Sequence, residues 1–279
     1  MPVAVTGADG PVGRALVPML VSRGGEVRAS APDRDRARVL RALGAKVAVG
    51  DPSGEDVLWP LLQDAHTLCH LAADPLAADG DTERINLKVV EAVLTAAAAA
   101  GIRRLLLLSS VGASPGSPNP TLRALGRAEA LVSGAGLEHV ILRTTHVVGE
   151  GSAWMILTAL LARRRPPVVV GPGTQVMAPV LAEDVARVLV AADHRAEAVD
   201  GTLAAAGPER LTADRVADLI AGRTRRWKRH VDRVPGLGDA AARILAADSL
   251  PDAPDACARF AVIPSSAFPL PQGPGGGGG

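Results

Sequence analysis

Residues 6–13 read TGADGPVG and stand between a short apolar run, residues 3–6, and a helix-length amphipathic segment, residues 11–23. A glycine-rich turn that joins a strand to a helix is a common binding site for the pyrophosphate of a dinucleotide. Taken alone, the glycine pattern is weak. Its position directly after the first strand of a repeated strand–helix series makes it specific.

Each glycine of this turn has a separate physical role. Gly7 permits a tight turn, Gly10 lets backbone N–H groups approach the phosphates, and Gly13 allows the helix to pack closely on the strand. The helix N-terminus then faces the anion. The predicted phosphate-binding turn is completed by Asp9, Pro11 and Val12.

Strand-like and helix-like patterns alternate from this turn to about residue 150. The expected strands are residues 3–6, 26–30, 46–49, 67–71, 105–109 and 139–143, and the expected helices are residues 11–23, 34–43, 85–100 and 122–133. This alternation predicts an α/β fold with a Rossmann-type doubly wound parallel sheet over residues 1–150. Residues 151–263 are expected to form an interleaved small substrate lobe, with a strand at 168–170 and helices at 183–193 and 212–222. Residues 264–279, rich in Pro and Gly, are expected to be a disordered tail.

Composition narrows the functional classes. The 279 residues are 48% hydrophobic with a formal net charge of +1, which gives no electrostatic argument for a nucleic-acid partner. The two cysteines, Cys69 and Cys257, suggest reduced thiols and no disulfide framework. His66 and His70 lack a third ligand, so no metal site is expected. No secretion signal or membrane-length apolar run is recognisable, and we therefore expect a cytoplasmic protein with no membrane partner.

Further motifs resemble the short-chain dehydrogenase/reductase superfamily. They are Gly-Asp at 50–51, His-Leu-Ala-Ala at 70–73, Leu-Ser-Ser at 108–110 and Leu-Arg-Thr-Thr-His at 142–146. The sequence is most similar to the atypical branch that contains quinone-reductase-like and nitrogen-metabolite-repressor-like proteins. The resemblance implies that Asp51 contacts the adenine and that the segment after the sixth strand flanks the nicotinamide. It extends the expected cofactor-binding set to Pro52, Leu71, Ala72, Ala73, Ser109 and Thr144.

The end of the second expected strand bears on the choice between NADPH and NADH. A carboxylate there accepts hydrogen bonds from a ribose 2′-hydroxyl and repels a 2′-phosphate. Many relatives carry an arginine where Pro32 stands, whereas Ser30, Arg34 and Arg36 offer replacement contacts to a phosphate. Asp33 argues for NADH. The balance favours NADPH, with NADH as the alternative.

The sequence contains no tyrosine. The resemblance implies a catalytic tyrosine followed four residues later by lysine, and Thr121 and Leu125 stand at the matching positions. A threonine hydroxyl is too weakly acidic to replace a phenol. The candidates for catalytic residues are therefore Ser110, at the family's serine position, His146, as the group best matched to neutral pH, and Thr121, as a substrate contact. Trp154, Met155 and Met177 are expected to form an apolar floor for an aromatic substrate.

Two functions remain open. The first is an NAD(P)H-dependent reductase of a quinone or hydroxylated aromatic ketone, whose own hydroxyl stabilises the new oxyanion and makes the tyrosine dispensable. The abundance of alanine and arginine suggests a high-GC genome, where an anthraquinone-like polyketide, as in antibiotic biosynthesis, is a plausible substrate. The second is a catalytically inactive NAD(P)-binding redox sensor or regulator. An isomerase or dehydratase ranks last, because it would normally keep the tyrosine.

Overall fold

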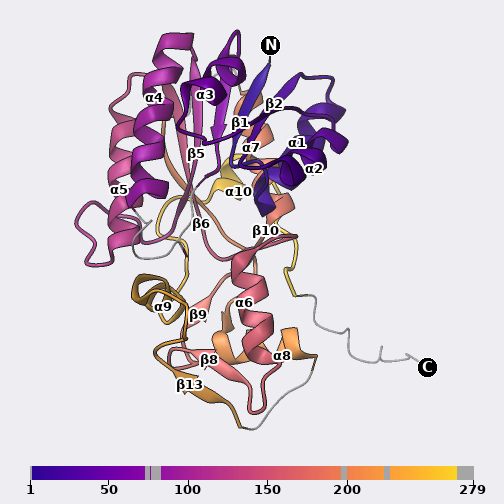
Figure 1. Ribbon diagram of the computed structural model, residues 1–279. Helices are drawn as coiled ribbons and strands as arrows, with labels where there is room; N and C mark the ends of the chain where they lie inside the picture. Colours follow the sequence, from indigo (N-terminus) through magenta and orange to yellow (C-terminus); the bar gives the residue numbers. More distant parts are fainter. Residues whose placement is uncertain (1, 73–75, 77–82, 196–199, 223–226, 269–279) are drawn as a thin grey trace.

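A seven-stranded parallel sheet forms the centre of the computed structural model, which describes residues 2–72, 76, 83–195, 200–222 and 227–268 (Figure 1). The strand order is β11-β6-β5-β4-β1-β2-β3, and each adjacent pair is parallel. Its strands are β1 (Val3–Thr6), β2 (Val27–Ala31), β3 (Lys46–Val49), β4 (Thr67–His70), β5 (Arg104–Ser110), β6 (Glu138–Thr144) and β11 (Gly201–Ala205). The expected Rossmann-type sheet is confirmed. The direction of winding reverses between β1 and β4, where such sheets bind their ligands.

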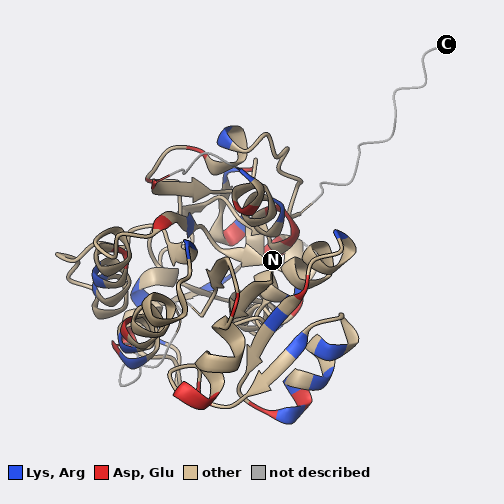
Figure 2. Cartoon of the chain, turned by 90° about the horizontal axis from the view of Figure 1, so that it is seen from above, with Lys and Arg blue, Asp and Glu red and all other residues tan. Residues whose placement is uncertain are grey.

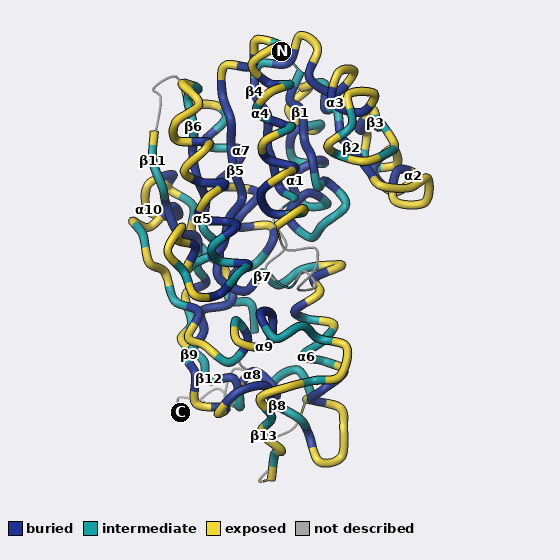
Figure 3. The backbone as a smooth tube through the Cα atoms, turned by 60° about the vertical axis from the view of Figure 1, so that its left-hand side comes forward, coloured by how far each residue is buried: buried dark blue, intermediate teal, exposed yellow. Residues whose placement is uncertain are grey.

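Helices cover both faces of the sheet. One face packs against α1 (Pro11–Ser22), α2 (Arg34–Ala42), α7 (Ala182–His194) and α10 (Ala256–Arg259). The other packs against α3 (Glu55–Leu62), α4 (Val89–Ala100) and α5 (Pro120–Ser133), with a π-helical turn, η1 (Arg84–Lys88), before α4. Because both faces are covered, all seven residues of β5 are buried, and the central strands are dark in Figure 3.

A smaller lobe lies beyond the carboxyl ends of the strands (Figure 1). It contains α6 (Ala153–Ala162), β8 (Val168–Val170), β9 (Val176–Met177), β12 (Leu211–Thr212), α8 (Ala213–Ala221), β13 (Arg229–Val231) and α9 (Asp239–Leu245). A short parallel pair, β7 (Val147–Val148) and β10 (Val180–Leu181), leads into and out of it. Residues 182–205 return to the sheet as α7 and β11, so the segment expected to form the lobe is divided between lobe and sheet.

The described part of the chain adds three observations on partners. None of its helices is both long and apolar enough to cross a membrane. Its His, Cys, Asp and Glu side chains form no group of three or more able to hold a metal ion. In the view from above, basic and acidic residues are interspersed (Figure 2). Cys69 and Cys257 are both buried free thiols.

Candidate dinucleotide and substrate cleft

The glycine turn leaves β1 at Thr6 and enters α1 at Pro11. Gly7 has a φ of +67°, and a Cβ atom there would lie 2.6 Å from the backbone nitrogen of Ala72. A Cβ at Gly13 would lie 2.4 Å from the Cα of Ala8, so neither position accepts a side chain without rearrangement. Gly10 is the N-cap of α1 and supplies no side chain, which leaves the N–H groups of the first helical turn open to an anion.

This turn forms one wall of a cleft of about 1000 Å³ at the carboxyl ends of the strands. Such a volume lies at the upper end of ligand pockets and suits a dinucleotide with a second molecule beside it. Most of the residues predicted from the sequence line it. They are Gly7, Asp9, Gly10, Pro11, Val12, Gly13, Ser30, Pro52, Leu71, Ala72, Ser109, Ser110, Thr144, His146 and Trp154. Ala73 lies outside the described residues.

At the end of β2, the cleft meets Ser30, Pro32 and Arg36. Arg36 Nη1 forms an ion pair of 2.8 Å with the Asp9 carboxylate. Asp33 does not line the cleft, because its carboxylate accepts hydrogen bonds from two backbone N–H groups at the start of α2. Arg34 is exposed on α2 and does not line the cleft, so the structure does not bring it together with the other predicted cofactor residues.

Asp51 also lies outside the cleft, between the two lining residues Gly50 and Pro52. Its carboxylate accepts hydrogen bonds from the backbone N–H (2.8 Å) and the hydroxyl (2.6 Å) of Ser53. These two bonds lower the pKa of Asp51. The carboxylate therefore stabilises its own turn, and the adenine contact of Asp51 stays a prediction.

Three candidates for the substrate side are also placed differently from the prediction. Thr121 is fully buried in the first turn of α5 and does not line the cleft. Met177 is buried in the core of the lobe, and Met155 packs against that same core. The family resemblance that suggested Met155 and Met177 could not distinguish a cleft wall from a lobe core, because both are apolar.

His146 and Trp154 form a stacked pair in the cleft wall, with ring centroids 4.8 Å apart and an interplanar angle of 7°. Burial lowers the pKa of His146 to about 4, because the charged imidazolium would lose its hydration. The imidazole is therefore neutral at pH 7, and the expectation of a group that titrates near neutrality is wrong. Its Nε2 atom is buried without a hydrogen-bond partner among the described residues.

The depressed pKa of His146 predicts a loss of stability in mild acid. The unfolded chain takes up a proton near pH 6.5, whereas the folded chain does so only near pH 4. Stability therefore falls as the pH drops through this window, by about 2 kcal/mol at about pH 5. The free energy of unfolding in urea is measured at about pH 7.5 and about pH 5. Between these two pH values it should fall by about 2 kcal/mol less in His146→Phe than in the unchanged protein. His194→Phe, at an exposed histidine, serves as the control; equal losses in all three proteins would contradict the prediction.

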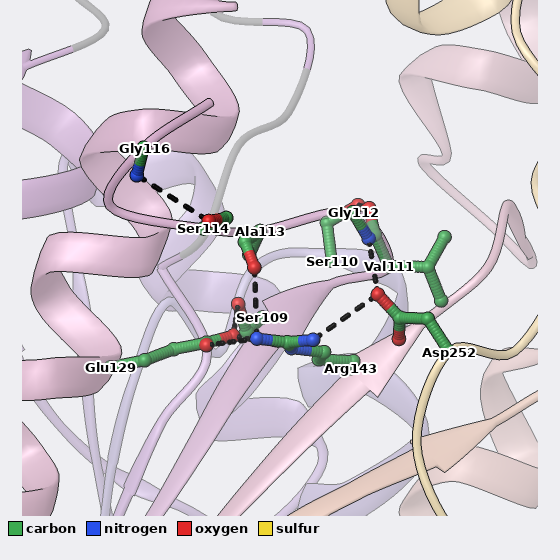
Figure 4. Close-up of polar contacts among 10 residues, drawn as sticks. All are labelled: Ser109, Ser110, Val111, Gly112, Ala113, Ser114, Gly116, Glu129, Arg143 and Asp252. Atoms are coloured by element: carbon green, nitrogen blue, oxygen red, sulfur yellow. Dashed lines mark hydrogen bonds and ion pairs between the residues drawn. The ribbon is translucent and has the colours of Figure 1, made fainter. Parts of the chain in front are cut away.

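A chain of polar contacts runs behind the cleft at the ends of β5 and β6 (Figure 4). The Ser109 hydroxyl donates to Glu129 Oε1 at 2.6 Å, and Arg143 donates to both oxygens of Glu129, at 3.0 and 2.6 Å. Arg143 Nη1 also donates to Asp252 Oδ2 at 3.1 Å. The Glu129 carboxylate raises the pKa of Arg143, so this guanidinium stays charged.

Another part of the cleft wall comes from residues 247–252, which follow α9. No sequence signal pointed to this segment. It has no glycine motif and no periodic pattern, and it reaches the cleft only through the packing of the lobe. Asp252 is the main residue that the sequence prediction missed.

Comparisons with known proteins agree with this geometry. Residues 7–196, more than half of the chain, match the model of a family described as NAD(P)H-binding. The chain belongs to this NAD(P)H-binding family. Its relatives place it with the atypical short-chain dehydrogenases/reductases, which confirms the resemblance predicted from the motifs.

Three relatives of this NAD(P)H-binding protein have established names. It is 28% identical over 236 residues to subunit 9 of the NADH dehydrogenase [ubiquinone] 1 alpha subcomplex, mitochondrial, of Arabidopsis thaliana (81% of this chain, 59% of the relative). It is 35% identical over 108 residues to the 4-hydroxy-2-methyl-3-oxo-4-farnesyl-3,4-dihydroquinoline-1-oxide ketoreductase of Stigmatella aurantiaca (38% and 32%). It is 24% identical over 229 residues to the NAD(P)H azoreductase of Xenophilus azovorans (82% and 76%). The chain thus spans less than two thirds of the first two relatives.

A solved structure, MoeE5 in complex with UDP-glucose and NAD, shares the fold of this NAD(P)H-binding protein. The TM-score is 0.73 at 22% identity, and the match covers 95% of this chain and 94% of that one. The common fold agrees with the Rossmann-type sheet and with a ligand cleft at the carboxyl ends of its strands.

Proposed function

We propose that this protein is an NAD(P)H-dependent reductase that transfers hydride to a quinone or a hydroxylated aromatic ketone. The observation that carries the proposal is the continuity of the cleft from the glycine turn to the His146–Trp154 pair. A ligand in the second half is thereby held beside the nicotinamide end of a bound cofactor. The names of two relatives, a ketoreductase and an azoreductase, support reduction of such conjugated substrates.

The cradle fits a dinucleotide, because a Cβ at Gly7 or Gly13 would collide with the backbone that shapes the turn. The dihydronicotinamide, when bound, supplies the hydride. Hydride adds to the carbonyl carbon, the π-electron pair moves to the oxygen, and a proton on that oxygen completes the alcohol. From a quinone, this product becomes the hydroquinone when the same carbon loses its C–H proton and the second carbonyl oxygen gains one. The protein's part is to orient the ring against Trp154 and to keep that contact dry.

The residues of the cleft explain why the substrate must help with the proton. The chain has no tyrosine, and burial keeps His146 neutral, so it is no imidazolium acid. The Ser110 hydroxyl lines the cleft and makes only a long contact of 3.4 Å with the Val111 carbonyl, so it is available to the substrate oxygen. A phenolic hydroxyl beside the carbonyl then stabilises the oxyanion and delivers the proton.

The direct test follows NADPH and NADH absorbance with a panel of quinones, hydroxyanthraquinones and simple aliphatic ketones. We expect oxidation of the cofactor with the aromatic compounds and none with the aliphatic ketones, which lack the internal hydrogen bond. Tight binding of the cofactor without oxidation by any compound would favour the inactive sensor instead.

We further propose that NADPH is the preferred cofactor. No carboxylate lines the end of β2, since Asp33 caps α2, while Ser30 and Arg36 line the cleft there. Arg36 neutralises Asp9 at 2.8 Å, so the carboxylate of the glycine turn does not repel a phosphate unopposed. Arg36 is also half-exposed, and its guanidinium can make a charge-assisted contact to a 2′-phosphate beside Asp9.

Replacing Arg36 tests this preference. Arg36→Ala should raise the Kd for NADPH by about tenfold to 100-fold, because it removes a charge-assisted contact and leaves Asp9 unpaired, with little change for NADH. Arg34→Ala removes an equal charge two residues away, outside the cleft, and should change neither Kd. A preference of the unchanged protein for NADH by about tenfold or more would overturn the assignment.

A further inference from the structure

Asp252 reaches the cleft from a part of the chain that matches no motif of the dinucleotide domain. Its Oδ2 accepts a hydrogen bond from the backbone N–H of Gly112 at 2.7 Å and the ion-pair contact from Arg143 at 3.1 Å (Figure 4). These two contacts join the segment after α9 to the loop after β5. They hold the carboxylate at the substrate end of the cleft, near Ser110.

The negative charge of Asp252 is only partly neutralised. Arg143 donates from Nε and Nη2 to Glu129 and from Nη1 to Asp252, so one guanidinium pairs with two carboxylates. The three side chains Arg143, Glu129 and Asp252 together carry a formal charge of −1. Asp252 Oδ1 has no hydrogen bond to any described residue, and the side chain is 32% exposed. One carboxylate oxygen therefore remains to be satisfied by water or by a ligand.

The charges that line the cleft are divided between its two ends. Among the described lining residues, the arginines are Arg14 and Arg36, and both contact Asp9 in the glycine turn. The substrate end carries Asp248 and Asp252, and His146 there is neutral. A bound dinucleotide thus meets two arginines and one ion-paired carboxylate, Asp9, at one end, whereas the second ligand meets the carboxylates of Asp248 and Asp252.

We infer that Asp252 determines substrate specificity: its Oδ1 accepts a hydrogen bond from a hydroxyl of an uncharged aromatic substrate, and its charge excludes carboxylated or phosphorylated substrates. This inference rests on the proposed reductase function and names the substrate class within it. An ionised carboxylate such as Asp252 accepts a strong hydrogen bond from a hydroxyl. It repels a substrate that places a second negative charge beside it. Glu129 and Arg143 act as positioning residues, since they touch Asp252 or its partner and do not line the cleft.

The test uses two anthraquinones that differ at one substituent. Aloe-emodin carries a hydroxymethyl group where rhein carries a carboxylate. Binding of each to the NADP⁺-loaded protein is measured by calorimetry, and kcat/KM is measured by oxidation of NADPH. The unchanged protein should prefer aloe-emodin by about tenfold or more in both readouts.

Asp252→Asn keeps an oxygen for Gly112 and removes the charge. Asp252→Asn should reduce the preference for aloe-emodin over rhein by about fivefold or more, mainly because rhein binds more tightly. The Kd for NADPH should not change. Asp35→Asn, at an exposed position of α2, removes the same charge away from the cleft and should leave the preference unchanged.

The outcomes separate this inference from the proposed function. Turnover with the same preference in the unchanged protein and Asp252→Asn would overturn the inference and leave the reductase in place. A preference in binding that Asp252→Asn narrows, without any oxidation of NADPH, would support the inference and overturn the reductase. Failure of both compounds to bind overturns the inference as well.

Discussion

Gly10→Ala is expected to raise the Kd for NADPH by about 100-fold while the protein remains folded. The loss corresponds to about 2.8 kcal/mol of binding free energy. The physical reason is that the pyrophosphate must approach the backbone at this position, and a methyl group would occupy that space. Within the protein itself the new Cβ would meet only the Gly7 carbonyl oxygen, at 3.5 Å, which is an ordinary contact.

Gly10 is a sharper test than its neighbours in the turn. Alanine at Gly7 or Gly13 would bring Cβ within 2.6 or 2.4 Å of backbone atoms, so those variants would damage the fold and binding together. Gly116→Ala is the matched control, because the position is exposed and a Cβ there would have no neighbouring atom within 4 Å. Binding is measured by calorimetry and folding by thermal unfolding. An unchanged Kd in Gly10→Ala would show that the phosphates do not lie on this turn.

The elements around the glycine turn could be predicted from the sequence because they obey local rules. The turn residues have a required backbone geometry, and the strands of a parallel sheet are short, continuous apolar runs. Strands β1, β3 and β8 begin and end where predicted, and the other predicted strands and helices differ by a few residues. The helix expected at residues 85–100 is also present, but its first turn is the π-helical η1.

Other elements could not be predicted from the sequence because they lack a periodic pattern of apolar residues. Helix α6 is apolar on nearly every side, and α3 contains Pro60, so neither shows the alternation that identifies an amphipathic helix. Strands β7, β9, β10 and β12 have two residues each, which is too short for any pattern.

The substrate half of the site could be predicted only in part, since it depends on burial and on distant contacts. The position of His146 after the sixth strand correctly brought it to the cleft. Its low pKa arises from burial in the folded chain and from nothing near it in the sequence. Asp252 meets Arg143 across a separation of 109 residues, and only the packing of the lobe against the sheet brings them together.

Arg143→Met is expected to destabilise the protein by about 3–5 kcal/mol, because it leaves a buried carboxylate without its cation. Only 8% of the Glu129 side chain is exposed, and Arg143 supplies two of its hydrogen bonds. Arg143 also donates to the Ala113 carbonyl at 2.8 Å, so the loop after β5 loses a second contact. The free energy of unfolding in urea measures the loss. Arg38→Met, at an exposed arginine of α2, should change it by less than about 0.5 kcal/mol.

A double variant distinguishes the cost of leaving the Glu129 carboxylate unpaired from the cost of losing the other contacts of Arg143. Glu129→Gln keeps an oxygen that accepts the Ser109 hydroxyl but carries no charge, so Glu129→Gln/Arg143→Met should be more stable than Arg143→Met by about 2 kcal/mol. Such a gain would identify the buried carboxylate as the main cost. If the double variant is instead as unstable as the sum of the two single changes, the pair does not interact, and Arg143 stabilises the fold through Ala113 and Asp252 alone.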